Sequence, residues 1–197
     1  MNDRTEERER ILEAAYQLLD RSDGAMLEVT QILNETGLGT RAFYRHFKTR
    51  DELLLVMLRR DRDQVLDRLH NTVATAVDAV DALRDWVDQM FALLSQPRRN
   101  RRVSIFRSEE MQRARGYQRE LERFWTAEQA LLAQIISQGK TAGHFPDADP
   151  QPDARAVRAV IEAAIRDQLE HPTAASPRQT AGQTLAFILR GLGFRSR

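Results

Sequence analysis

The sequence contains no cysteine, which excludes disulfide bonds and thiolate metal sites. It also lacks any apolar run close to the roughly 18 residues that a membrane-spanning helix requires. The longest such run is LLLVML at 53–58, and the first ten residues, MNDRTEERER, contain no apolar stretch of the kind found in signal peptides. These absences predict a cytoplasmic protein that does not associate with membranes.

Motifs of catalytic sites are missing as well. No GxSxG turn, GxGxxG turn or phosphate-binding loop occurs, and no two histidines have the HExxH spacing of a zinc site. In the segment GHFPDAD, the side chains of His144, Asp147 and Asp149 suggest either a metal site or, more simply, a solvated loop. We therefore expect no enzyme activity, no cofactor and no metal.

Charge is balanced over the whole chain but not along it. Lys and Arg together number 30 against 29 acidic residues, so the molecule is not a polycation that would coat nucleic acid. Residues 39–50, in contrast, include Arg41, Arg45, Lys48 and Arg50 and no acidic residue. Any attraction to an anion is therefore expected to be local.

Apolar residues recur at helical spacing through almost the whole chain, and no sustained alternation of period two occurs. This pattern predicts an all-α protein of about nine helices, in which a small N-terminal unit precedes a larger helical body. We place the first domain at residues 1–48 and the second at 49–197. The expected helices span residues 5–21, 28–36, 40–47, 49–71, 73–95, 98–115, 117–142, 153–170 and 177–192.

Two short helices joined by a turn at Gly37 are typical of a helix-turn-helix. Phe43 and Phe47, four residues apart, are expected to anchor the second helix on its inner face. In such units the N-terminal residues of the second helix meet base edges in the major groove of DNA, which here means Thr40 and Arg41. The remaining polar side chains are expected to point outward, toward phosphates: Tyr44, Arg45, His46 and Lys48.

Other interpretations of this basic segment stay open. It could be a solvated surface on a core helix, or the N-terminal unit could bind a protein partner. The turn glycine, the local charge and the signature of a capping box at Thr49 and Glu52 favour DNA. Salt dependence separates the two binding modes, because only DNA binding is expected to weaken steeply with salt.

The segment from Ile11 to Leu58, and above all GLGTRAFYRHF, resembles the TetR/AcrR family of bacterial transcriptional regulators. The resemblance implies a homodimer that binds an inverted-repeat operator in double-stranded DNA, usually as a repressor, and is released by a small apolar or amphipathic effector. It implies base contacts by Thr30, Thr40 and Arg41, and phosphate contacts by Tyr44, His46 and Arg50. The sequence departs from the family pattern at Glu28, Gly39 and Ala42.

The body beyond residue 60 matches the family only in length and helical pattern. Large apolar side chains there suit either an ordinary core or an effector pocket, and the resemblance favours the pocket. The candidate pocket residues are Trp86, Met90, Phe91, Phe106, Met111, Tyr117, Phe124 and Trp125.

Two apolar stripes near the C-terminus either cover the monomer core or, as the resemblance implies, pair across a two-fold axis. The candidate interface residues are Val157, Val160, Ile161, Ala164, Ile165, Leu185, Ile188, Leu189 and Leu192.

A second basic run contains Arg98, Arg99, Arg101, Arg102 and Arg107. It suits a solvated helix start, which we favour, a site for an acidic group of a ligand, or a further DNA or partner surface.

Overall fold

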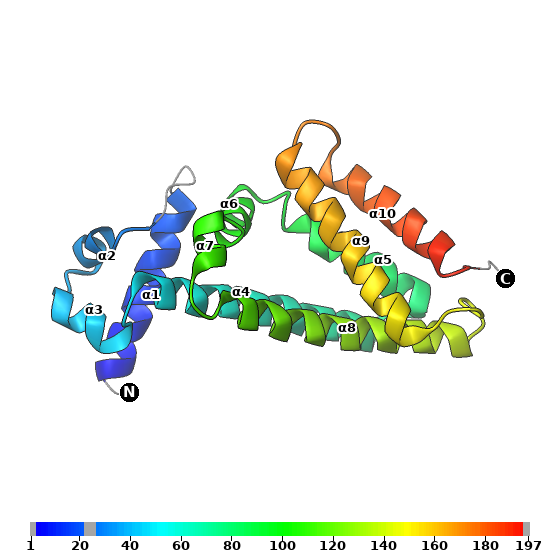
Figure 1. Cartoon of the computed structure of the whole chain (residues 1–197), viewed down its shortest axis with the longest axis horizontal. Coiled ribbons are helices and arrows are strands. Elements are labelled where there is room, and N and C mark those ends of the chain that lie inside the picture. The colour runs from blue at the N-terminus through cyan, green and yellow to red at the C-terminus, as the bar shows by residue number, and fades with distance from the viewer. Residues whose placement is uncertain (1–2, 22–26, 195–197) are drawn as a thin grey trace. The chain divides into compact units, whose positions relative to one another are not determined.

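The computed structural model describes residues 3–21 and 27–194. These residues form ten α-helices and no strand, which confirms the all-α prediction (Figure 1). The helices are α1 (Asp3–Arg21), α2 (Val29–Thr36), α3 (Thr40–His46), α4 (Arg50–Thr75), α5 (Ala79–Ala92), α6 (Pro97–Phe106), α7 (Glu109–Arg113), α8 (Tyr117–Thr141), α9 (Pro150–Glu170) and α10 (Pro177–Gly191).

The helix count exceeds the expected nine because the predicted helix at 98–115 is divided into α6 and α7. The break is set by an N-cap, since Ser108 Oγ accepts a hydrogen bond from the Met111 backbone N–H at 3.2 Å. A similar cap moves the start of α5. Asp78 Oδ1 accepts hydrogen bonds from two backbone N–H groups at 2.8 and 2.9 Å, so α5 begins there and not near residue 73.

The chain divides into two compact units. The first comprises residues 1–62 and 97–121, and the second comprises residues 63–96 and 122–197. The compact first unit thus extends past residue 48 and takes in α6 and α7. The functional division at residue 48 stays a prediction.

The first unit has a continuous apolar core in which α1 contributes Ile11, Leu12 and Leu19, all fully buried. Phe43, on α3, and Phe47, the C-cap residue of that helix, are both buried as predicted, with ring centroids 5.8 Å apart. Burying each such side chain contributes about 1.5–3 kcal/mol, which is enough to hold a helix as short as α3 in place. In Figure 1, α1 to α3 run from dark blue to cyan.

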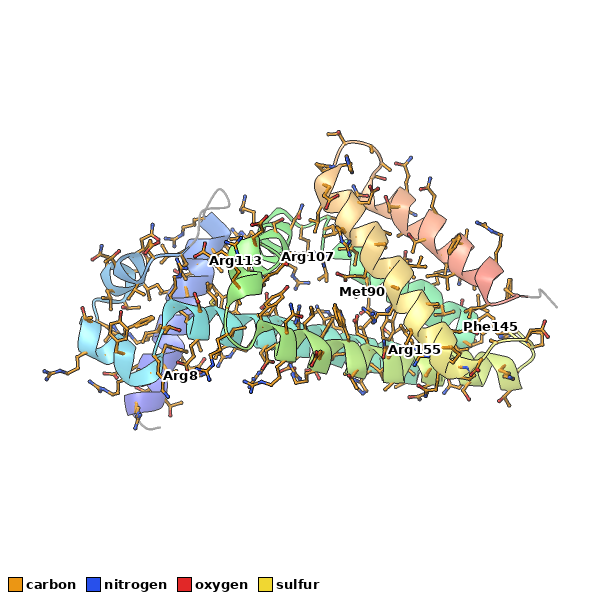
Figure 2. All side chains as sticks on the ribbon, viewed as in Figure 1. Arg8, Met90, Arg107, Arg113, Phe145 and Arg155 are labelled. Carbon is orange, nitrogen blue, oxygen red and sulfur yellow. The ribbon has the colours of Figure 1, made fainter. Side chains whose placement is uncertain are left out.

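The second unit packs α10 against both α5 and α9 (Figure 1). Gly139 on α8 lies so close to the Phe145 ring and to Ala79 that a Cβ at this position would collide with the ring. Phe145 is fully buried and is labelled in Figure 2. Within residues 3–21 and 27–194, the structure contains no helix with the length and hydrophobicity of a membrane span.

Candidate nucleic-acid interface

The turn between α2 and α3 depends on Gly37, whose φ of 65° lies in the left-handed region that favours glycine. The end of α2 is also capped from another helix, because Arg10 Nη2 on α1 donates a hydrogen bond to the Thr36 carbonyl at 2.7 Å. Thr36 Oγ1 in turn accepts from the Leu38 N–H at 3.3 Å. The direction in which α3 leaves the turn is therefore fixed by α1 as well as by the glycine.

The outer face of α2 and α3 is polar and exposed. Thr30 lies in the first turn of α2, and Thr40 and Arg41 begin α3, with Gly39 as N-cap. Tyr44 is 54% exposed and its ring packs edge-on against Phe43, with centroids 5.4 Å apart. Tyr44 thus lies at the surface, on the same helix as Thr40 and Arg41.

His46 does not lie on this outer face, so the expectation that it points outward is wrong. Its side chain is only 3% exposed, and its Nε2 lies 3.0 Å from Glu7 Oε2 on α1. Arg45 pairs with the same oxygen, at 3.2 Å from Nη1. The cause is a carboxylate 39 residues earlier in the chain, which a local view of the sequence does not reveal.

Arg50, the predicted phosphate ligand at the start of α4, is surrounded by carboxylates. Its guanidinium lies 3.5 Å from Glu28, at the N-cap of α2, and 3.6 Å from Asp51. It also pairs with Glu110 on α7. The acidic residue at position 28, unusual for the resembled family, is thereby matched by a cation within the same unit.

The join between α3 and α4 forms largely as predicted. Thr49 Oγ1 accepts a hydrogen bond from the Glu52 N–H at 3.1 Å. Glu52 reaches back one residue further than a standard capping box, to the Lys48 N–H at 2.7 Å. Within the described ranges, Arg41 and Lys48 have no carboxylate partner, so they supply the unpaired positive charge of this face.

Two arginines of the second basic run, Arg101 and Arg102, pair within the first unit, whereas Arg98 is exposed. Arg102 lies 3.3 Å from Asp61 on α4 and 3.2 Å from Asp20 on α1, and its guanidinium covers the Tyr16 ring at 5.1 Å. Arg101 Nη2 donates to the Asp20 carbonyl at 2.6 Å. These two arginines therefore join α6 to α1 and α4.

Two further groups of this network are partly buried. The Tyr16 hydroxyl, with its one hydrogen, has two acceptors within reach: Asp61 Oδ1 at 2.9 Å and the Met57 carbonyl at 3.1 Å. Burial raises the pKa of the Asp61 carboxyl, although Arg102 and the Tyr16 hydrogen bond oppose the rise. Burial and the neighbouring Asp61 also raise the pKa of Tyr16, so its hydroxyl stays protonated and keeps its donor role.

The predicted effector residues fall into both units. Three of them complete the core of the first unit: Phe106, Met111 and Tyr117. The other five lie on α5 and α8 of the second unit: Trp86, Met90, Phe91, Phe124 and Trp125. Of these, Met90 is labelled in Figure 2, and the Trp125 ring is covered by the Arg158 guanidinium at 4.6 Å.

The predicted dimer residues divide by burial. Five are already buried within the single chain: Val157, Ile161, Ile165, Ile188 and Leu192. Four are only partly buried: Val160, Ala164, Leu185 and Leu189. The same two helices expose other apolar residues, including Phe187, which is 55% exposed, and Ala156, Ala159 and Ala163.

No group of three or more metal-ligating side chains able to hold an ion occurs in the part of the chain that the structure describes. In the GHFPDAD loop, the His144 ring packs against the rings of Phe145 and Phe194, at centroid distances of 6.3 and 6.5 Å. The loop is thus organised by aromatic packing.

No model of a known protein family matches the chain. An HTH-type transcriptional regulator of Staphylococcus aureus strain USA300 is 30% identical over 99 residues, which cover 47% of this chain and 54% of the relative. The chain therefore spans about half the length of the curated relatives it matches.

Solved structures resemble the chain over nearly its full length. NalD, the secondary repressor of the MexAB-OprM multidrug efflux pump in Pseudomonas aeruginosa, is 25% identical with a TM-score of 0.69, covering 96% of both chains. FadR of Bacillus subtilis, in complex with stearoyl-CoA, has a TM-score of 0.74 at 14% identity and covers 93% of this chain and 98% of its own.

A TetR-family transcriptional regulator from a Rhodococcus species has a TM-score of 0.64 at 21% identity, covering 93% of this chain and 97% of its own. The chain thus resembles transcriptional regulators in sequence and TetR-family regulators in fold, which confirms the resemblance predicted from residues 11–58.

Proposed function

We propose that the protein is a sequence-specific DNA-binding transcriptional regulator, a repressor that leaves its operator when a small molecule binds. The observation that carries this proposal is the exposed face of α2 and α3. It combines a glycine turn, a buried aromatic anchor and an outward row of hydroxyl and cationic side chains. That combination suits a helix held against the major groove.

The roles on this face follow from chemistry and position. Arg41, at the start of α3, suits the two acceptors of guanine, O6 and N7, while Thr30 and Thr40 suit single contacts to base edges. Tyr44 and Lys48 suit phosphate oxygens, which set register without reading sequence. Arg45, His46 and Arg50 are held by carboxylates in the free protein, so they are weaker candidates for phosphate contacts.

We further propose a homodimer on an inverted repeat, since one short recognition helix seldom supplies enough specificity. The exposed apolar residues of α9 and α10 are better candidates for the interface than the residues already buried in the chain. Phe187→Glu is expected to yield monomers in analytical ultracentrifugation. A dimer that persists in this variant would place the interface elsewhere.

The effector is proposed to be apolar or amphipathic and to bind in the second unit among Trp86, Met90, Phe91, Phe124 and Trp125. Support comes from adaptable methionine and aromatic side chains on α5 and α8. The stearoyl-CoA complex of FadR adds a precedent in a protein of the same fold. We also propose that residues 1–48 read DNA and that residues 49–197 bind the effector and form the dimer. The proposed location is the cytoplasm.

Selection of bound duplexes from a random pool tests the proposed function. An enriched inverted repeat would establish a dimeric sequence-specific regulator, and its half-site spacing would give the separation of the recognition helices. If the purified protein enriches no sequence, the selection is repeated in the presence of cell extract. Enrichment only under that condition would show that a ligand is required for DNA binding. A protein-interaction module would enrich no sequence under either condition, and its binding would depend only weakly on salt.

A further inference from the structure

One carboxylate oxygen pairs with two side chains near the end of α3. Glu7 Oε2, on α1, lies 3.0 Å from His46 Nε2 and 3.2 Å from Arg45 Nη1. The Glu7 side chain is 16% exposed, whereas that of Arg45 is 46% exposed. The carboxylate is thus largely enclosed while the arginine lies on the surface that would approach DNA.

Glu7 stays ionised in this arrangement. The hydrogen bond from His46, with the positive charge of Arg45, holds the pKa of the Glu7 carboxyl below its usual range. A negative charge therefore persists beside the Arg45 guanidinium at neutral pH. The pair as a whole carries no net charge.

Neutralising Arg45 has a consequence for DNA binding. Attraction to the DNA backbone comes from releasing counterions, and each phosphate that a free cation neutralises adds about 0.9 to the log–log salt slope. A guanidinium already paired with a carboxylate releases few counterions.

We propose that Glu7 limits sequence-independent DNA binding by holding Arg45 and His46 away from the phosphate backbone. This inference rests on the proposed function, because it assumes that α3 meets DNA. Lower affinity for bulk DNA reduces the fraction of protein occupied at competing sites, which are far more numerous than operators. Glu7, which lies on α1 outside the helix-turn-helix, thus determines how readily the Arg45 and His46 side chains contact phosphates.

Glu7 could instead serve only to position α3. Substitutions distinguish this structural role from the proposed effect on DNA binding. Glu7→Gln removes the charge but keeps an oxygen that accepts the His46 hydrogen bond, so α3 is held as before. Glu13→Gln is the matched control, because Glu13 is an exposed residue of the same helix and the charge change is identical.

The experiment measures binding of the full-length variants to random duplex DNA over a series of salt concentrations, with circular dichroism to confirm folding. For Glu7→Gln we expect affinity about fivefold higher at about 0.15 M salt and a slope steeper by about 0.9 per protomer. Glu13→Gln should match the wild type. Arg45→Ala alone leaves the Glu7 carboxylate without its cation, so affinity should fall, but the salt slope should stay that of the wild type because no phosphate contact is lost. In the Glu7→Gln background, Arg45→Ala should cancel the steeper slope, as a double-mutant cycle reveals.

Three results would overturn the proposal: an unchanged or weaker affinity in Glu7→Gln, an equal gain in Glu13→Gln, or a salt slope shallower by about 0.9 in Arg45→Ala alone, which would show that Arg45 already contacts a phosphate in the wild type. If Glu7→Gln does not fold, the measurement on Arg45→Ala alone still tests the proposal. Failure of the proposed function is distinct. In that case the wild type itself would show no salt-dependent binding to DNA.

Discussion

The two basic segments of the chain, residues 39–50 and 97–107, are similar in composition but differ in what they meet. In the second segment, Arg101 and Arg102 turn inward onto Asp20 and Asp61 and join three helices. In the first segment, Arg41 and Lys48 stay exposed while Arg45 and Arg50 are paired with carboxylates of other helices. What an arginine does is therefore decided by which acidic residues the fold brings beside it.

The largest expected effect comes from a substitution in residues 97–107, the segment in which two arginines pair within the first unit. Arg102→Ala should lower the free energy of unfolding by about 2–3 kcal/mol, because it leaves Asp61 and Asp20 partly buried without their cation. The figure is below that for a fully buried pair, since about a fifth of the Arg102 side chain is exposed. Urea denaturation measures the loss. Arg98→Ala, at an exposed position of the same helix, should change stability by less than about 0.5 kcal/mol.

Substitutions at the exposed cations of residues 39–50 should change DNA binding and leave the free energy of unfolding unchanged. Arg41→Ala is expected to remove about 2 kcal/mol of discrimination at one base pair of each half-site, because a bidentate contact to guanine is lost. Affinities for the selected operator and for operators altered at each position measure this. Lys48→Ala is the contrasting variant, since loss of a phosphate contact should weaken binding to all sequences alike. Unaltered base preference in Arg41→Ala would remove Arg41 from the reading role.

Tyr44→Phe should weaken DNA binding by about 1 kcal/mol, the value of one hydrogen bond. The ring would still pack on Phe43, so stability should be unaffected. Since the hydroxyl is expected to contact phosphate, operator and random DNA should lose affinity by the same factor. A loss confined to the operator would instead assign Tyr44 to base reading.

The smallest expected effect concerns a pair that joins α1 to α4 beside these segments. Glu9 accepts hydrogen bonds from Arg60 at 2.7 and 2.9 Å, and these lower the pKa of the Glu9 carboxyl. The stabilisation is therefore present above about pH 4.3, the usual value for glutamate, and is lost as the pH falls through the lower folded-state value.

Both partners of this pair are substantially exposed, so Glu9→Gln should cost only about 0.5 kcal/mol at neutral pH. The cost should vanish in strong acid. Urea denaturation of wild type and variant at the two pH values measures the difference. An equal cost at both would show that the Glu9 charge is not the cause.

The elements that local sequence specifies were predictable. Gly37, the Phe43 and Phe47 spacing and the cap at Thr49 each act within a few residues, and each forms as expected. The breaks before α5 and α7 also had local signals, in Asp78 and Ser108, which a view based on apolar periodicity alone overlooked.

The pairings of the candidate site could not be read from the sequence in this way. His46 and Arg50 are held by Glu7 and Glu110, which lie 39 and 60 residues away along the chain. Such partners become neighbours only when the helices pack. The exposure of a charged residue is thus a property of the tertiary fold, even where its helix is plain from local pattern.

The hydrogen bond from Arg10 to the Thr36 carbonyl affects how the DNA-reading helices could be reused in engineering. Arg10 on α1 satisfies a backbone carbonyl at the C-terminus of α2. A peptide containing α2 and α3 alone therefore lacks this hydrogen bond, and it also lacks the apolar residues of α1 against which the two helices pack. A graft of this motif into another scaffold must carry α1 with it. A portable reading module of this protein therefore needs at least α1 together with α2 and α3.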